Sequence, residues 1–255
     1  METLDVRGTP VEIHRAGSGP PLLYLHAEQF GDQVRPHLDA LARTWTVIAP
    51  LHPGYGATSG AGDLRSVEDL AYLYLDLLDV LKLDQVVLVG ASLGGWIALE
   101  MCVRNHARLS KLVLVSSVGV KFGGREERDF ADLFYLPDDK AFPLLFADPE
   151  RHAPRYTEVS EDQLERLARE RHMLAHYGWR PYLHNPNLRR WLHRVALPTL
   201  VLWGEADGFA KPSYGQSLAS ALPSAELKLI PGAGHYPAIE QSEATIRAID
   251  AFVRK

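Results

Sequence analysis

One short segment carries residues suited to nucleophilic chemistry, Gly90-Ala91-Ser92-Leu93-Gly94-Gly95. It follows the apolar run Val86–Val89 and precedes a helical pattern. A serine hydroxyl attacks a carbonyl only where it is exposed, oriented and served by a base. A sharp strand–turn–helix elbow supplies the exposure and requires small residues two positions either side of the serine. A glycine-rich turn without chemistry has the same letters, but the flanking strand and helix patterns favour a nucleophile at Ser92.

A base and an orienting acid must come from elsewhere in the chain. Of the 11 histidines, His235 has the most informative setting, a glycine-rich turn between a strand pattern and the last helix. Asp207 lies in a loop directly after the apolar run Leu200–Trp203. The order Ser92, Asp207, His235 is the order expected for this elbow class. A helix-capping aspartate or a structural loop histidine is common by itself. Three such residues in this order, each after a strand, predict a catalytic triad.

Short apolar runs and amphipathic stretches alternate along the chain. The strands and helices that they predict must position Ser92, Asp207 and His235. Continuous apolar runs are typical of strands buried on both faces of a mainly parallel sheet covered by helices. The predicted strands are Val11–His14, Leu22–Leu25, Thr46–Ala49, Val86–Val89, Leu112–Val115, Leu200–Trp203 and Leu227–Ile230. The predicted helices between and after them are Val67–Leu81, Trp96–Asn105 and Ser242–Val253. The sequence therefore predicts an α/β fold.

The alternation stops between residues 118 and 195. This stretch is rich in charged and aromatic side chains, and its clearest helical pattern is Glu161–His176. Insertions of this kind commonly form a lid over a site. We therefore expect residues 1–117 and 196–255 to form the core, and residues 118–195 to form a helical cap.

These motifs resemble the α/β-hydrolase family along nearly the whole chain. The shared features are the apolar strand leading to His26, the turn Pro53-Gly54-Tyr55-Gly56, the elbow, and the segments 198–207 and 232–237. The resemblance implies a serine hydrolase with an eight-stranded, mostly parallel sheet flanked by helices. It also implies that the helical cap is inserted after the sixth strand.

The resemblance further implies an oxyanion hole made by the backbone N–H groups of Glu28 and Leu93. Two such fixed donors each lower the barrier by roughly 3 kcal/mol. The sequence departs from the family pattern at two positions. Ala27 stands where a glycine is usual, and Leu51 stands where relatives often carry an aspartate.

The aromatic, leucine-rich cap favours a small, mainly apolar carboxylic ester, cleaved through an acyl-enzyme on Ser92. Two alternatives remain open. One is hydrolysis of a carbon–carbon bond in a diketone-type substrate, which would be favoured by a basic residue in the pocket such as Arg180 or Arg190. The other is a hydrolase-like ligand receptor with slow turnover. The candidate substrate contacts are Trp96, Tyr236 and Trp179.

Composition limits the partners. The net charge of -5 gives no electrostatic reason to expect nucleic acid or an anionic membrane. The amino terminus lacks the apolar core of a signal peptide, and the uncharged stretch 85–99 is too short to span a membrane. We expect a cytoplasmic enzyme whose partner is a small-molecule substrate, and the sequence leaves its oligomeric state open.

No cofactor is expected. The triad mechanism requires no metal, flavin or nucleotide, and no phosphate-binding motif is visible. His172 and His176 have a spacing that suits zinc, but no third ligand of matching context accompanies them, which favours an exposed helix face. The single cysteine, Cys102, excludes an internal disulfide and lies in an apolar helical stretch, where a buried, inert thiol is expected.

Overall fold

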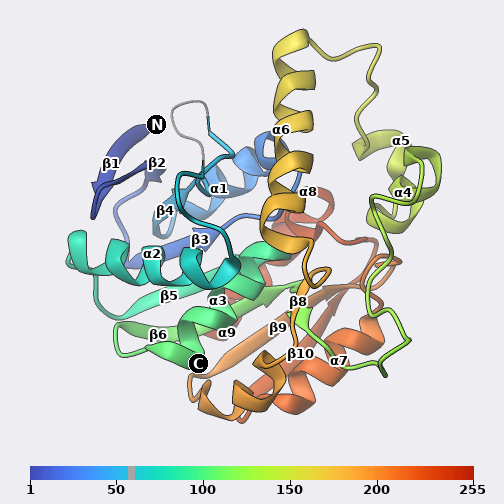
Figure 1. Ribbon diagram of the computed structural model, residues 1–255. Coiled ribbons are helices and arrows are strands. Elements are labelled where there is room, and N and C mark those ends of the chain that lie inside the picture. Colours follow the sequence, from blue (N-terminus) through green and yellow to red (C-terminus); the bar gives the residue numbers. More distant parts are fainter. Residues whose placement is uncertain (57–60) are drawn as a thin grey trace.

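The computed structural model describes residues 1–56 and 61–255. Among these residues, eight strands form one sheet in the order β1-β2-β4-β3-β5-β6-β9-β10 (Figure 1). The strands from β4 to β10 in this order pair in parallel, and β1 and β2 are antiparallel at one edge. Their bounds are β1 Glu2–Val6, β2 Thr9–Ala16, β3 Pro21–Leu25, β4 Thr46–Pro50, β5 Val86–Ala91, β6 Leu109–Val115, β9 Thr199–Gly204 and β10 Ala225–Ile230.

Helices cover both faces of the sheet. On one face α2 (Val67–Val80), α3 (Leu93–Arg104) and α7 (Pro212–Ala221) pack on a large apolar cluster, and on the other face α1 (Arg35–Leu41) and α9 (Ser242–Val253) pack on a second one. Because side chains alternate along a strand, Leu23 and Leu25 of β3 belong to the first cluster, and Leu22 and Tyr24 to the second. The predicted eight-stranded, mostly parallel sheet flanked by helices is confirmed.

The edge strand β1 is the one strand of this sheet that the sequence analysis did not predict. It joins β2 through a turn at Arg7 and Gly8, whose φ angles are 54° and 91°. Four of its five side chains are exposed or half-buried, so its sequence mixes polar and apolar residues. A strand of this kind lacks the continuous apolar run by which the central strands were found.

Residues 118–195, which we call the cap segment, follow β6. The segment contains α4 (Asp138–Leu145), the short α5 (Pro149–His152), α6 (Glu161–Gly178) and the 3-10 helix η2 (Leu188–Arg194). A two-residue pairing of β7 (Gly119–Val120) with β8 (His184–Asn185) also lies within it. Figure 1 shows α6 projecting beyond the sheet, in the region where Glu161–His176 was predicted to be helical.

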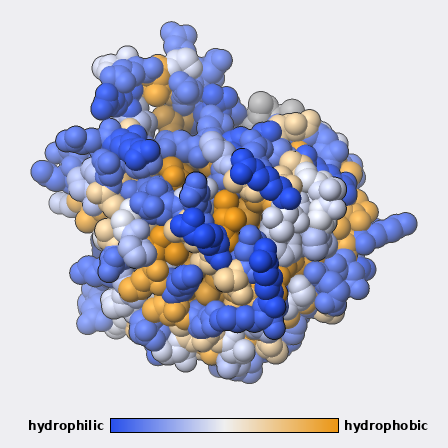
Figure 2. All heavy atoms as spheres, turned by 180° about the vertical axis from the view of Figure 1, so that it is seen from behind, coloured by the Kyte–Doolittle hydropathy of each residue, from blue (hydrophilic) through white to orange (hydrophobic). Residues whose placement is uncertain are grey.

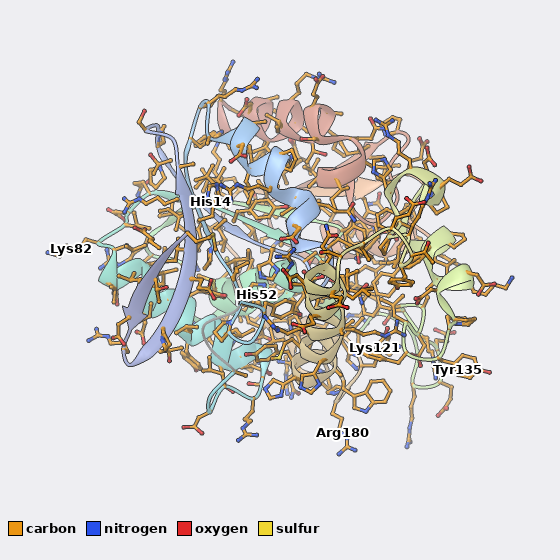
Figure 3. The ribbon with its side chains drawn as sticks, turned by 90° about the horizontal axis from the view of Figure 1, so that it is seen from above. His14, His52, Lys82, Lys121, Tyr135 and Arg180 are labelled. Atoms are coloured by element: carbon orange, nitrogen blue, oxygen red, sulfur yellow. The ribbon has the colours of Figure 1, made fainter. Side chains whose placement is uncertain are left out.

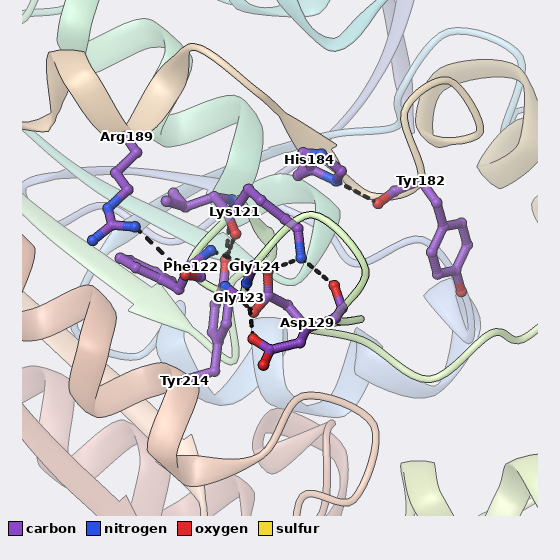
Figure 4. A network of polar contacts seen from close by, with 11 residues as sticks. Lys121, Phe122, Gly123, Gly124, Asp129, Tyr182, His184, Arg189 and Tyr214 are labelled. Carbon is purple, nitrogen blue, oxygen red and sulfur yellow. Dashed lines mark hydrogen bonds and ion pairs between the residues drawn. The ribbon is translucent and has the colours of Figure 1, made fainter.

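Polar contacts fasten the start of the cap segment to the core (Figure 4). The Tyr214 hydroxyl of α7 donates to the Val120 carbonyl at 2.7 Å and accepts from the Val120 N–H at 3.0 Å. The following turn is closed by the Asp129 carboxylate, which accepts the N–H groups of Phe122 at 3.0 Å and Gly123 at 2.9 Å. The chain therefore leaves the core in a defined direction.

Hydrophilic side chains dominate the face opposite to that of Figure 1, and hydrophobic ones appear there in patches between them (Figure 2). Within residues 1–56 and 61–255, no helix combines the length and the apolar character that crossing a membrane requires.

Candidate active site

The elbow residue Ser92 lies between β5 and α3, with φ 46° and ψ -109°. Such a conformation is uncommon for a residue with a side chain and marks a strained turn. A Cβ at Gly90 would collide with the backbone of Gly94, and a Cβ at Gly94 would collide with the carbonyl oxygen of Leu25. The close approach of these backbones explains why small residues flank Ser92 on both sides.

The structure brings Ser92, Asp207 and His235 together. His235 Nε2 lies 2.8 Å from Ser92 Oγ, and His235 Nδ1 lies 2.8 Å from Asp207 Oδ2. The other oxygen of Asp207 accepts the N–H groups of Phe209 at 3.0 Å and Ala210 at 2.9 Å, which fixes the carboxylate. The three side chains therefore form a continuous chain of hydroxyl, imidazole and carboxylate.

The surroundings of His235 make its imidazole a stronger base. Burial lowers its pKa, but the charge of Asp207 and its hydrogen bond raise it, with smaller contributions from Glu28 and Glu240. The net result is a pKa above the ordinary histidine value. An imidazole with a raised pKa accepts a proton from a hydroxyl more readily.

The cap segment touches both loops that carry the base and the acid. The carbonyl of Leu145, at the end of α4, accepts the His235 N–H at 2.7 Å. The carbonyl of Leu144 accepts the N–H groups of Gly208 at 3.0 Å and Phe209 at 2.9 Å. The end of α4 thus positions the His235 loop relative to the Asp207 loop.

The loop after β3, residues 26–31, contains the predicted oxyanion donor Glu28. His26 starts it, with its ring stacked on that of His52 at 3.7 Å and its Nε2 accepting the His52 N–H at 2.9 Å. The left-handed conformation in this loop falls on Phe30, at φ 61°, and not on Ala27. The loop therefore does not need a glycine at position 27.

A carboxylate from the cap segment holds the other end of this loop. Glu170 of α6 accepts the Phe30 N–H at 2.8 Å and the Gly31 N–H at 3.1 Å. Burial raises the pKa of Glu170 to about 7, although the two N–H donors oppose this shift. Glu170 was not among the predicted site residues, since no local signal separates it from the other charged residues of α6.

The side chain of Glu28, rather than its N–H alone, lies in the site. The Leu93 N–H donates to Glu28 Oε2 at 3.4 Å, and the Tyr236 hydroxyl donates to Glu28 Oε1 at 2.8 Å. The backbone N–H of Glu28 has no acceptor among the described residues. The sequence predicted a backbone donor at Glu28 and a candidate substrate contact there, but not the contacts of its carboxylate with Leu93 and Tyr236.

Little open space adjoins Ser92. The cavity that it lines together with His235 and Tyr236 has a volume of about 20 Å³, which is room for about one water molecule. Phe30 lines this cavity and also one of about 40 Å³ between α4 and α6, whose lining mixes apolar side chains with polar ones such as Asp138 and Arg171. The rings of Phe30, Phe146 and Tyr236 contact one another, with centroids 5.2 to 5.3 Å apart. A substrate must displace some of these side chains.

Of the three predicted substrate contacts, only Tyr236 lines the cavity of Ser92. Trp96 and Trp179 line a different cavity of about 220 Å³, which does not reach Ser92. Trp96 is buried in α3, and its indole N–H donates to Glu100 at 3.2 Å. The spacing along the chain placed Trp96 near the elbow, but its position on α3 turns the ring away from Ser92.

The two arginines considered for an acidic substrate are also remote from this cavity. Arg180 lines the cavity of Trp96 and Trp179, is exposed, and projects outward from the molecule in Figure 3. Arg190 is exposed, with its guanidinium 5.4 Å from the ring centroid of Trp191. Neither arginine is among the described residues that line the cavity of Ser92.

His176, which was considered as a zinc ligand, and Cys102 lie in structural surroundings. His176 Nε2 lies 2.8 Å from the carbonyl oxygen of Leu64. Among residues 1–56 and 61–255, no three His, Cys, Asp or Glu side chains are grouped so that they can hold a metal ion. Cys102 is fully buried, which raises the pKa of its thiol to about 12.

Comparison with known proteins agrees with this architecture. Residues 16–248 match the model of the alpha/beta hydrolase family, so the chain belongs to that family. It is 27% identical to a 2-hydroxymuconate semialdehyde hydrolase of Pseudomonas sp. (strain CF600), over 96% of this chain and 91% of that protein.

Two solved structures share the fold. A meta-cleavage product hydrolase from Pseudomonas fluorescens IP01 has a TM-score of 0.79 and 20% identity, covering 100% of this chain and 97% of that one. A thermophilic esterase from Thermogutta terrifontis has a TM-score of 0.77 and 24% identity, covering 99% and 96%. Together with the family match, these similarities support a hydrolase.

Proposed function

We propose that this protein is a serine hydrolase that cleaves a small, mainly apolar carboxylic ester through an acyl-enzyme on Ser92. The observation that carries the proposal is the His235 imidazole, which lies 2.8 Å from both the Ser92 hydroxyl and the Asp207 carboxylate. This arrangement supplies a nucleophile, a base and a group that orients the base.

The reaction proceeds in two halves. His235 Nε2 takes the Ser92 proton while Ser92 Oγ bonds to the ester carbonyl carbon, and Asp207 stabilises the imidazolium that forms. The oxyanion accepts hydrogen bonds from the N–H groups of Leu93 and Glu28. His235 then gives its proton to the leaving alcohol, and an acyl-enzyme remains. Water attacks the acyl carbon, His235 takes a proton from that water, and the carboxylic acid leaves as Ser92 regains its proton.

The surroundings of Ser92 support a small and apolar substrate. Phe30 separates the cavity of Ser92 from the second cavity, whose apolar residues include Ala141 and Phe142 of α4 and Leu167 of α6. Asp138 and Arg171 line the same cavity and are paired with each other at 3.2 Å. An acyl chain that displaces Phe30 enters this cavity beside its apolar residues. Phe30 therefore limits the substrate to short acyl chains unless its ring moves.

Hydrolysis of a carbon–carbon bond is a second candidate, because the name of the relative from Pseudomonas sp. (strain CF600) is that of a semialdehyde hydrolase. A substrate with an acidic group would be expected to meet a basic side chain near the nucleophile. The described residues that line the cavity of Ser92 include no Lys or Arg, and the arginine that lines the second cavity, Arg171, is already paired with Asp138 at 3.2 Å. The ester is therefore the preferred substrate class.

Three measurements test the proposal. A fluorophosphonate probe should label wild type rapidly and should not label Ser92→Ala. Wild type should hydrolyse p-nitrophenyl esters of graded acyl length faster than a diketone or dienoic keto acid, and Ser92→Ala should have no such activity while its circular dichroism spectrum stays unchanged.

Full activity in Ser92→Ala rejects the assignment of the nucleophile. If the diketone is cleaved faster than the esters, the protein is a carbon–carbon bond hydrolase, which is the second candidate. Tight ligand binding with negligible turnover in wild type identifies a receptor instead of an enzyme.

A further inference from the structure

The Glu28 carboxylate occupies a place that a substrate oxyanion needs. The Leu93 N–H, which is one of the two donors assigned to the oxyanion, already donates to Glu28 Oε2 at 3.4 Å. The Tyr236 hydroxyl holds the other carboxylate oxygen at 2.8 Å, and the Glu28 side chain is buried. An ester carbonyl that uses the Leu93 N–H must therefore displace a carboxylate oxygen.

No described Lys or Arg side chain balances this carboxylate, and the His235 imidazole is already paired with Asp207 at 2.8 Å. Among the described residues, Glu28 forms no ion pair, and the lining of the cavity of Ser92 contains neither Lys nor Arg. Tyr55 is uncharged and supplies no positive charge. Its pKa is raised well above the usual value, mainly by burial and to a smaller extent by the charges of Glu28 and Glu170. Glu28 therefore has no cationic partner of its own among the residues that the structure places in the site.

Substrate binding leaves this carboxylate with fewer partners. As the carbonyl takes the Leu93 N–H, Glu28 loses one of its two donors, while the proton that His235 takes from Ser92 balances the charge of the oxyanion alone. A buried charge without a partner is costly. An ammonium group on the substrate would supply the missing positive charge, whereas a carboxylate or sulfonate would add another negative one.

We propose that Glu28 is a specificity-determining residue that makes the site prefer esters carrying an ammonium group and reject esters carrying an acidic group. This inference rests on the proposed ester hydrolysis and names the charge of its substrate. If the Glu28 carboxylate and the ammonium group lie about 6 Å apart at an effective dielectric constant of about 20, their attraction corresponds to a roughly 100-fold higher kcat/KM than for an uncharged ester.

Two series of matched esters test the proposal, because the charge can lie on either side of the ester bond. The first series is the choline, 3,3-dimethylbutyl and 2-sulfoethyl esters of butyric acid. The second is the p-nitrophenyl esters of trimethylammoniobutyric acid, of its uncharged tert-butyl analogue and of glutaric acid. Wild type should favour the cationic over the neutral ester by about 10- to 100-fold in at least one series, and disfavour the anionic ester by about as much.

Glu28→Gln preserves the size of the side chain and an acceptor for Tyr236, but removes the charge. It should bring the three esters of each series to within about threefold of one another. Glu28→Asp retains the charge and should retain the order of preference. As a matched control, Glu226→Gln removes a carboxylate from β10, where Glu226 pairs with Lys255 at 2.7 Å, and should leave the wild-type ratios unchanged.

Fluorophosphonate labelling of every variant separates the two proposals. If wild type is labelled and cleaves the neutral esters but treats all charges alike, the role of Glu28 is wrong and the hydrolase stands. The same holds if Glu28→Gln retains the wild-type preference. If wild type is neither labelled nor active on any ester, the proposed function itself is wrong. Should Glu28→Gln fail to fold, the wild-type ratios and those of Glu28→Asp decide, because both proteins must then prefer the cationic ester.

Discussion

The carboxylate of Glu170 joins the cap segment to the loop that carries Glu28, and Glu170→Gln tests this connection. Burial raises the pKa of Glu170 from its usual 4.5 to about 7. Between these pH values the folded protein holds a proton that the unfolded chain releases. The stability contributed by this group is therefore fully present below pH 4.5 and is lost as the pH rises through about 7.

The size of this loss follows from the two pKa values. The interval from 4.5 to about 7 corresponds to about 3 kcal/mol of unfolding free energy, at about 1.4 kcal/mol per pH unit. Between about pH 5 and about pH 8.5, wild type should lose about 2 to 3 kcal/mol of unfolding free energy through Glu170. Gln does not titrate, so Glu170→Gln should lack this component. Gln has one acceptor oxygen where Glu has two, and the lost hydrogen bond costs about 1 kcal/mol of unfolding free energy. This cost is the same at both pH values, so it cancels when the two values are subtracted.

Urea unfolding, followed by tryptophan fluorescence at both pH values, measures the difference. The matched control is Glu165→Gln, which removes an exposed carboxylate from the same helix and should show the pH dependence of wild type. Should wild type and Glu170→Gln lose the same free energy between the two pH values, the raised pKa of Glu170 would be refuted.

Four further outcomes are expected. Asp207→Asn should lower kcat on a p-nitrophenyl ester by about four orders of magnitude, because the imidazole loses its orienting carboxylate; a loss below about tenfold contradicts this role. In wild type, kcat/KM should rise with pH through an apparent pKa above the ordinary histidine value, because Asp207 raises the pKa of His235. The residual activity of Asp207→Asn should rise through a lower pKa, because this variant lacks the charge of Asp207. Gly94→Ala should lower the unfolding free energy by about 1 to 3 kcal/mol in urea, because its Cβ meets the Leu25 carbonyl; unchanged stability would count against the close approach. Phe30→Ala should shift the preferred p-nitrophenyl ester to longer acyl chains by joining the two cavities, and an unchanged chain-length profile would mean that Phe30 does not limit the substrate.

The central strands could be predicted from the sequence because burial on both faces requires continuous apolar runs. Strands β5 and β9 are buried along their whole length, and the runs Val86–Val89 and Leu200–Trp203 lie within them. The edge strand β1 is mostly exposed or half-buried, and β7 and β8 are only two residues long, so the same criterion did not find them. The division of the chain into core and cap remains a prediction.

The candidate triad also comes from local patterns. Each of its three residues follows a strand whose apolar run is visible in the sequence, and parallel strands bring their carboxyl ends to one edge of the sheet. The glycines beside Ser92 mark the elbow for a steric reason that the structure shows in the backbone of Leu25. Neither inference needs contacts between particular distant side chains.

The sequence by itself therefore determined the fold class, the elbow and the candidates for nucleophile, acid and base, since each depends on short-range patterns. Only the tertiary structure decided the direction of the Glu28 side chain, which is held by Tyr236, 208 residues further along the chain. It also placed Glu170 against Phe30 across 140 residues, and turned Trp96 and Trp179 away from Ser92. Side-chain directions of this kind depend on which distant groups meet when the chain packs, and no spacing along the sequence encodes that.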